Sequence, residues 1–139
     1  MHTPCPIRPI RIFGLADALA ACAAAAELGV PLTLISAPAA AAHAGALWFL
    51  DIVGKARDAH PQVALTAVLD CADRAGDAQA ALAAGATHVL FTGPTDVADR
   101  LAEIAAARGA TLLTDLPEAL DPRGARYKAA ACRDWLGGT

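Results

Sequence analysis

Short apolar runs alternate with alanine-rich stretches along the chain, and this alternation predicts a repeated strand–helix unit. The apolar runs have the length and composition of strands, whereas the alanine-rich stretches have helical character and several end at a glycine. The predicted strands are residues 10–15, 31–38, 63–70, 87–94 and 110–115. The predicted helices are residues 16–29, 40–59, 77–85, 95–109 and 125–136.

The strand runs at 10–15, 63–69 and 88–91 are apolar, or nearly so, at both alternating positions. This pattern is typical of parallel strands that helices cover on both faces. With right-handed crossovers, we therefore predict an α/β fold, a single three-layer domain over residues 1–139. Its five-stranded parallel sheet is expected to be doubly wound, in flavodoxin-like order, with helices on both faces. The chain is too short for the eight units of a βα barrel.

The composition limits the classes of protein to which the chain can belong. Of 139 residues, 56% are hydrophobic and 18% are charged, which excludes a disordered chain. The net charge is −3 and no basic stripe is present, which argues against nucleic acid as a partner. No uncharged apolar run reaches the length of a membrane span, so no membrane partner is expected.

The four cysteines are widely spaced, without a CxxC motif or a Cys/His cluster. This spacing argues against a zinc site or a disulfide framework and favours a reduced, cytoplasmic location. One alternative is that Leu19 to Cys22, LAAC, is the lipobox of a bacterial lipoprotein. Asp17 interrupts the apolar region that a lipoprotein leader would need, so we favour the cytoplasmic interpretation.

Parallel strands end at one shared edge of a sheet, and ligands of open α/β sheets bind at that edge. We therefore take the candidate site residues from the strand exits. They are Gly14 and Asp17 after the first strand, Ser36 and His43 after the second, Asp70, Cys71 and Asp73 after the third, Thr92, Gly93 and Thr95 after the fourth, and Thr114 and Asp115 after the fifth. Because Ser, Thr and Asp also cap helices, each has a structural alternative.

The segment AVLDCADRAG, residues 67–76, concentrates the candidate chemistry. Cys71 lies near a predicted helix N-terminus, which would lower its pKa, and His43 could pair with the resulting thiolate. Asp70 and Asp73 could instead hold Mg²⁺ together with Asp115; no other cofactor is predicted. The alternative that we favour is structural, with Asp73 capping the helix and Cys71 acting as a small hydrophobe.

The segment FTGPTD, residues 91–96, could receive a phosphate. Gly93 allows a tight turn, and the free N–H groups at the start of the following helix attract anions. Neither GxGxxG nor GxxxxGK[ST] is present, so a plain N-cap at Thr95 is the favoured alternative. The two lysines, Lys55 and Lys128, fall in predicted helices, which argues against Schiff-base chemistry.

Two segments resemble known families. Residues 62–104 are similar to the last third of a response-regulator receiver domain, with Thr66 at the threonine position of that family and Gly93 at its lysine position. The stretch AALAAGATHVLF is similar to one unit of βα barrels of the 2-keto-3-deoxy-phosphogluconate aldolase type. Both resemblances imply βα construction, and the first implies a flavodoxin-like order.

The predicted second helix lacks charge over residues 37–50, apart from what His43 could carry. Trp48 and Phe49 are adjacent, so they point to different sides of the helix, and only one can cover the sheet. We therefore expect a homodimer built on this helix, with Trp135 and Leu136 joining the interface. The alternative is a helix wrapped by its neighbours at the centre of the sheet.

Two functions remain open at this point, and with them the question of whether the chain is an enzyme. The first is a non-catalytic binding or regulatory module, homodimeric and without an assembled chemical site. The second is a small enzyme or a binder of a phosphorylated metabolite that uses the sheet edge around Asp70, Cys71 and Asp73.

Overall fold

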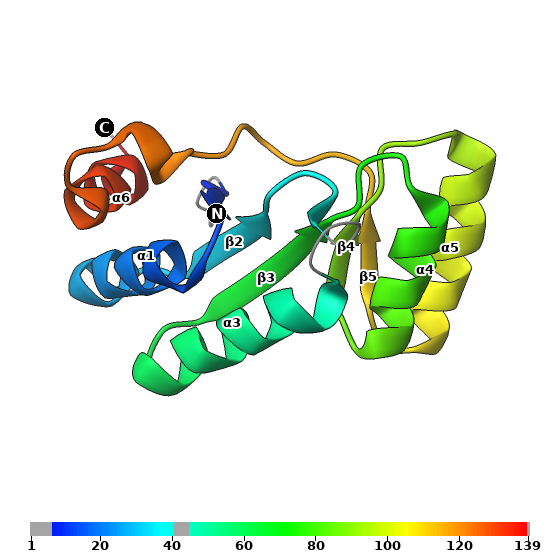
Figure 1. Cartoon of the computed structure of the whole chain (residues 1–139), viewed down its shortest axis with the longest axis horizontal. Coiled ribbons are helices and arrows are strands. Elements are labelled where there is room, and N and C mark those ends of the chain that lie inside the picture. The colour runs from blue at the N-terminus through cyan, green and yellow to red at the C-terminus, as the bar shows by residue number, and fades with distance from the viewer. Residues whose placement is uncertain (1–6, 41–44, 139) are drawn as a thin grey trace, which may run out of the picture.

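The computed structural model describes residues 7–40 and 45–138, and in this part the strands form one five-stranded sheet (Figure 1). The strands are β1 (Ile10–Ile12), β2 (Leu32–Ser36), β3 (Leu65–Asp70), β4 (His88–Leu90) and β5 (Thr111–Leu113). The helices are α1 (Leu15–Leu28), α3 (Ala46–Ala59), α4 (Ala75–Ala84), α5 (Thr95–Ala107) and α6 (Lys128–Gly137), with a short 3₁₀ helix η1 (Pro122–Gly124). Every strand pair is parallel, which confirms the predicted α/β class and the five parallel strands.

The strands lie in the order in which they occur in the chain, β1-β2-β3-β4-β5. A flavodoxin-like order would place β1 between β2 and β3, so the predicted doubly wound order is wrong. Each crossover advances by one strand in the same direction, and right-handed connections then place successive helices on one face. Contacts of α1 with α3, α3 with α4 and α4 with α5 show that these four helices form one layer.

Small side chains allow this helix layer to lie close to the sheet. The buried residues of α1 are mostly alanines, and α4 buries Ala78, Ala81 and Leu82 against the strands. Glycines end both helices in the left-handed conformation, Gly29 with φ 68° and Gly85 with φ 106°. A residue with a Cβ is strained at such a φ, so these glycines fix where each helix stops and the next strand begins.

The second face of the sheet carries no helix among α1, α3, α4 and α5. A small apolar cluster of Ile35, Val68 and Leu90 lies there instead. The chain after β5 supplies its cover, because Leu113, Leu116 and Ala119 pack on this cluster. We call residues 114–121 the strap. The predicted three-layer arrangement is therefore wrong, since the strap replaces the second helix layer.

The strap carries the chain from β5 back to the opposite edge of the sheet (Figure 1). There Leu120 pairs with Ile10 in parallel, through hydrogen bonds of 2.8 Å from Arg11 N to Leu120 O and 2.9 Å from Leu120 N to Pro9 O. The free edge of β1 is thereby covered by a single bridging residue.

After the strap, α6 runs alongside α1. Lys128 Nζ lies 2.7 Å from Asp17 Oδ1 at the start of α1, and Arg133 Nη1 lies 3.1 Å from Glu27 Oε2 near its end. Residues 19–22, the lipobox match, lie within α1, and Cys22 is buried. In the described part of the chain, no helix is both long and apolar enough to span a bilayer.

Candidate functional site

All five strands end at the same end of the sheet, as predicted, because all run in the same direction. We call this carboxyl-terminal end of the sheet the rim. Backbone hydrogen bonds join neighbouring exits: Ala39 N donates to Asp70 O over 2.9 Å, and Thr92 N donates to Ala72 O over 2.8 Å. The turns that carry the candidate residues therefore hold one another in place.

Among the predicted site residues, Asp70 has a side chain whose two oxygens both accept hydrogen bonds. Its Oδ2 accepts a hydrogen bond of 3.1 Å from Arg11 Nη1, and its Oδ1 accepts one of 2.9 Å from Ala72 N. Arg11 Nη1 also donates to Ser36 O over 2.6 Å, and Asp70 N donates to Ser36 Oγ over 2.9 Å. The charged pair therefore ties β1, β2 and β3 together at the rim.

The three carboxylates of the alternative magnesium site, Asp70, Asp73 and Asp115, do not lie together in the described residues. Both oxygens of the Asp70 side chain already accept hydrogen bonds, one of them from a cation. Asp73 and Asp115 are both exposed. In residues 7–40 and 45–138, no three His, Cys, Asp or Glu side chains gather as a metal site would require, so Asp70, Asp73 and Asp115 do not converge.

Cys71 is buried, which agrees with the favoured interpretation of a small hydrophobe and not with the alternative of a thiol whose pKa is lowered. Burial, followed by the carboxylates of Asp77 and Asp70, raises the pKa of the Cys71 thiol to about 12. A thiol in this environment stays protonated at neutral pH, so it does not supply a nucleophile. His43, its predicted partner, lies outside the described residues.

Two expected helix caps are also wrong. The N-cap position of α4 is Arg74, and no side chain caps it, so Asp73 does not have the expected role. The N-cap position of α5 is Pro94, again without a side-chain hydrogen bond, and Thr95 is the first helical residue. The start of α5 is thus left with backbone N–H groups that no side chain satisfies.

Four of the predicted rim residues, Thr92, Gly93, Thr95 and Thr114, come together in a hollow of about 380 Å³ between β4, β5 and α5. We call it the rim hollow. It is lined by Phe91, Thr92, Gly93, Thr95, Ala98, Asp99 and Thr114. Its polar groups are three threonine hydroxyls and one carboxylate, and the uncapped start of α5 adjoins them. The arrangement can form several hydrogen bonds to one small ligand.

Sequence reasoning missed two polar residues of the rim. Arg11 was not proposed, although a single arginine inside the apolar strand IRI signals a paired or functional charge. Asp99 was not proposed either, although its spacing of four residues from Thr95 places both on one face of α5. The first signal is a charge within a strand, and the second is helical periodicity.

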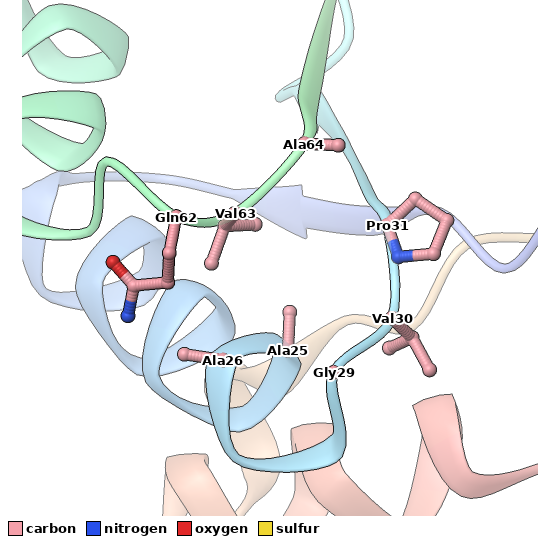
Figure 2. A pocket seen from close by; sticks show the side chains of 8 residues that line it. All are labelled: Ala25, Ala26, Gly29, Val30, Pro31, Gln62, Val63 and Ala64. Atoms are coloured by element: carbon pink, nitrogen blue, oxygen red, sulfur yellow. The ribbon is translucent and has the colours of Figure 1, made fainter.

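A second hollow lies at the opposite, amino-terminal end of the sheet (Figure 2). It has a volume of about 230 Å³ and lies between the end of α1 and the segments that lead into β2 and β3. Its side chains are aliphatic except Gln62. With so little polar chemistry, this hollow is a weaker candidate for a site than the rim hollow.

The adjacent aromatic residues of α3 separate as predicted. Phe49 is buried in the core, whereas Trp48 is 39% exposed and Leu47 is 70% exposed. At the other end of the chain, Trp135 Nε1 donates to Pro9 O over 3.1 Å, and Leu136 packs against the core. Trp135 and Leu136 therefore pack within their own chain. Among the exposed large apolar side chains of the described residues, Leu47 and Trp48 are the two that are adjacent in the chain.

No family model and no curated protein matches the chain in sequence. Solved structures do match it in fold. One is described as a "putative fructose-1,6-biphosphate aldolase" from Coccidioides immitis, at a TM-score of 0.64 and 21% identity. The match covers 77% of this chain and 44% of the other, so the chain spans less than half of that protein.

The sequential order and the single helix layer are those of consecutive units of a βα barrel. The AALAAGATHVLF stretch, which resembled such a unit, forms the end of α4, the Gly85 turn and β4 with Phe91. The order implied by the receiver-domain resemblance is not present. The fold is therefore a singly wound βα sheet with one helix layer. The strap crosses its other face and pairs with the lateral edge at β1.

Proposed function

We propose that the chain is a non-catalytic binding module whose ligand is a small phosphorylated metabolite held in the rim hollow. The observation that carries this proposal is the convergence of three hydroxyls, Thr92, Thr95 and Thr114, beside an uncapped helix start. The hydroxyls come from the exit of β4, the first turn of α5 and the exit of β5, so the hollow exists only in the folded chain.

The start of α5 suits a phosphate group. Pro94 provides no capping side chain, and the first intrahelical bond runs from Ala98 N to Pro94 O, so the preceding N–H groups of the first turn are available. Such groups and the helix dipole together favour an anion. The threonine hydroxyls can add hydrogen bonds to phosphate oxygens.

Asp99 indicates the chemistry of the part of the proposed ligand that lies away from the phosphate. A carboxylate repels a phosphate but accepts hydrogen bonds from hydroxyl groups. The proposed ligand is therefore a phosphorylated polyol or sugar, with its phosphate at the start of α5 and its hydroxyls toward Asp99. The solved structure of similar fold is described as an aldolase of a phosphorylated sugar, which is the same ligand class.

The chemistry of the lining supports binding rather than catalysis. The described residues of the hollow supply hydroxyls and one carboxylate, but no thiolate, imidazole or amine. Lys128 is paired with Asp17, and Lys55 is paired with Asp51 on α3, so neither lies at this hollow. The described residues that line the rim hollow therefore include no lysine that could form a Schiff base with a ligand.

We also propose that two copies of the chain associate through the start of α3. Leu47 and Trp48 are large apolar side chains exposed next to one another, whereas the neighbouring Phe49 faces the core. A self-complementary apolar contact between two copies would cover them.

A thermal-shift titration tests the ligand proposal. Glycerol 3-phosphate and ribose 5-phosphate should raise the melting temperature, while glycerol and ribose at the same concentrations should not. A ligand at 100 times its dissociation constant adds about 2.7 kcal/mol to the free energy of unfolding. Equal responses to the phosphorylated and unphosphorylated probes, or no response to either, would contradict the proposal.

Matched threonine variants localise the effect. Thr95→Val and Thr114→Val remove lining hydroxyls at nearly constant shape, and each should weaken binding about three- to tenfold. Thr111→Val is the control, because Thr111 is an exposed β5 residue that does not line the hollow. If Thr111→Val weakens binding as much as Thr114→Val does, the ligand is not in the rim hollow.

A further inference from the structure

A third hollow, of about 370 Å³, lies at the amino-terminal end of the sheet beside α6. Three segments meet around it: the residues before β1, the residues before β2 and the carboxyl end of α6. Its aliphatic side chains are Ile7, Val30, Pro31 and Leu136. This size and this mainly apolar lining are typical of sites for small molecules.

Arg8 supplies the charge of this hollow. Its guanidinium carbon lies 6.0 Å from the centre of the Trp135 ring, and a Cβ at Gly138 would lie 3.2 Å from its Nε and Nη2. The guanidinium therefore lies beside the aromatic ring and close to the backbone of Gly138. None of the ion pairs among the described residues involves Arg8.

We propose that this hollow binds a short aliphatic carboxylate. The carboxylate would accept the parallel N–H donors of Arg8, a geometry that a guanidinium suits particularly well. The hydrocarbon tail would lie among Ile7, Val30 and Leu136, out of water. The Thr33 hydroxyl is the other polar side-chain group of the lining and can donate to the second carboxylate oxygen.

Because the carboxyl end of α6 lies at this hollow, binding of an anion there requires the positive charge of Arg8. Leu136 and Gly137, the last residues of α6, line the hollow, and the carboxyl end of a helix carries partial negative charge. Without the guanidinium, this end would disfavour an anion. Binding of a carboxylate should therefore respond to the charge at Arg8 far more than to the apolar walls alone.

The test is a titration of the full chain with isovalerate and with isovaleramide, followed by backbone amide chemical shifts. The two probes have the same branched tail, and only isovalerate carries a charge. Isovalerate should give saturable shifts at Arg8, Val30, Thr33 and Gly137, and isovaleramide should bind at least about tenfold more weakly. Equal binding of the two, or no saturable shift with isovalerate, would overturn the proposal.

Two pairs of variants complete the test. Arg8→Gln should lose about tenfold or more in isovalerate affinity, whereas Arg100→Gln, an exposed arginine on α5, should bind as the parent does. Ile7 is 54% exposed, so Ile7→Asp and Ile7→Asn should both fold. Ile7→Asp would place a carboxylate beside Arg8 and should abolish binding. Ile7→Asn loses the same apolar contact without adding a charge, so it should weaken binding only about three- to fivefold. If both behave alike, the charge of Arg8 does not hold the ligand.

This site is at the opposite end of the sheet from the rim hollow. Its probes carry no phosphate, and its lining shares no residue with that of the rim hollow. A negative result here therefore leaves the rim proposal standing, and a negative result at the rim leaves this one standing.

Discussion

Arg11 and Asp70 are separated by 59 positions in the chain, yet Arg11 Nη1 and Asp70 Oδ2 lie 3.1 Å apart. The Asp70 side chain is 9% exposed and that of Arg11 is 22% exposed, so the pair is largely shielded from water. It spans β2, because the same Nη1 also donates to Ser36 O. Asp70 is thus a structural residue of the rim rather than a free acid or a metal ligand.

Removing the charge of Asp70 should destabilise the fold. Asp70→Asn leaves Arg11 without its carboxylate in a partly buried position, and we expect a loss of about 1.5–3 kcal/mol in the free energy of unfolding. Asp73→Asn is the matched control, because Asp73 is exposed, and it should change stability by less than about 0.5 kcal/mol. Urea denaturation measures both. Equal stabilities of the two variants would show that the pair contributes nothing.

Cys71 should be nearly inert to alkylation in the folded protein. Its pKa of about 12 lies well above the ordinary value of 9.0, so at pH 8 the thiolate is roughly a thousandfold rarer than in the unfolded chain. Iodoacetamide should therefore modify Cys71 only after denaturant is added, which peptide mass spectrometry measures. Rapid modification of Cys71 in the native protein near pH 7 would show that it is a reactive nucleophile and would contradict this prediction.

The raised thiol pKa values also predict how stability depends on pH. The pKa of Cys132 is raised to about 11, mainly by burial. The thiols of Cys71 and Cys132 therefore keep their protons to a higher pH in the folded state than in the unfolded state. The unfolded chain releases these protons from about pH 9 upward, which favours unfolding. The free energy of unfolding should thus be unaffected by these groups below pH 9 and should fall between about pH 9 and 12. Cys71→Ala should flatten this fall, and a fall of unchanged size would contradict the assignment to Cys71.

Gly93 should not tolerate a side chain. A Cβ at this position would clash with Cζ of the buried Phe91 ring, so Gly93→Ala must displace the ring. We expect a destabilisation of about 1–3 kcal/mol in urea denaturation. Gly76→Ala, in α4 with nothing within 4 Å of the added Cβ, should instead stabilise by about 0.5 kcal/mol. If Gly93→Ala is as stable as Gly76→Ala, the close contact with Phe91 is absent in solution.

The exposed start of α3 predicts the state of association. In sedimentation at micromolar concentration, the parent chain should behave as a dimer, and Trp48→Glu should behave as a monomer of unchanged fold. Leu28→Asp changes an exposed leucine at the end of α1 and should leave the dimer intact. A monomeric parent chain would end the proposal, and so would a Leu28→Asp variant that dissociates as Trp48→Glu does.

The βα alternation was predictable because it depends on local patterns. Glycine stops such as Gly29 and Gly85 and the apolar strand runs fix where elements begin and end, whatever their neighbours are. The direction of the strands followed as well, since long helical crossovers require parallel neighbours. These local and connective constraints placed the rim residues at one edge.

The strand order could not be derived in the same way, because right-handed crossovers permit either direction along the sheet. A partial signal was present in the residues that alternate with the apolar ones. Thr33, Thr66 and His88 lie at second-face positions, and none of them is buried. A face with such polar positions is poorly suited to a second helix layer, so the alternation favoured a sheet with helices on one face only.

The candidate site was predictable only as a set of strand exits. Which exits form a hollow depends on how distant segments pack. Thr92 and Thr114 line one hollow, whereas Asp70 is taken up by its hydrogen bond with Arg11. The state of Cys71 depends on burial, and the helix N-terminus that suggested a low pKa is outweighed by desolvation. Sequence spacing contains neither distance nor burial.

The most direct measurement of the central claim is a titration of the isotope-labelled chain with glycerol 3-phosphate, followed residue by residue through its backbone amides. We predict saturable shifts concentrated at Thr92, Thr95 and Thr114 and at the first-turn amides of α5, with Thr111 and the start of α3 unchanged. Shifts that spread over other surfaces, or an unperturbed spectrum at saturating ligand, would contradict the assignment of the rim hollow as the binding site.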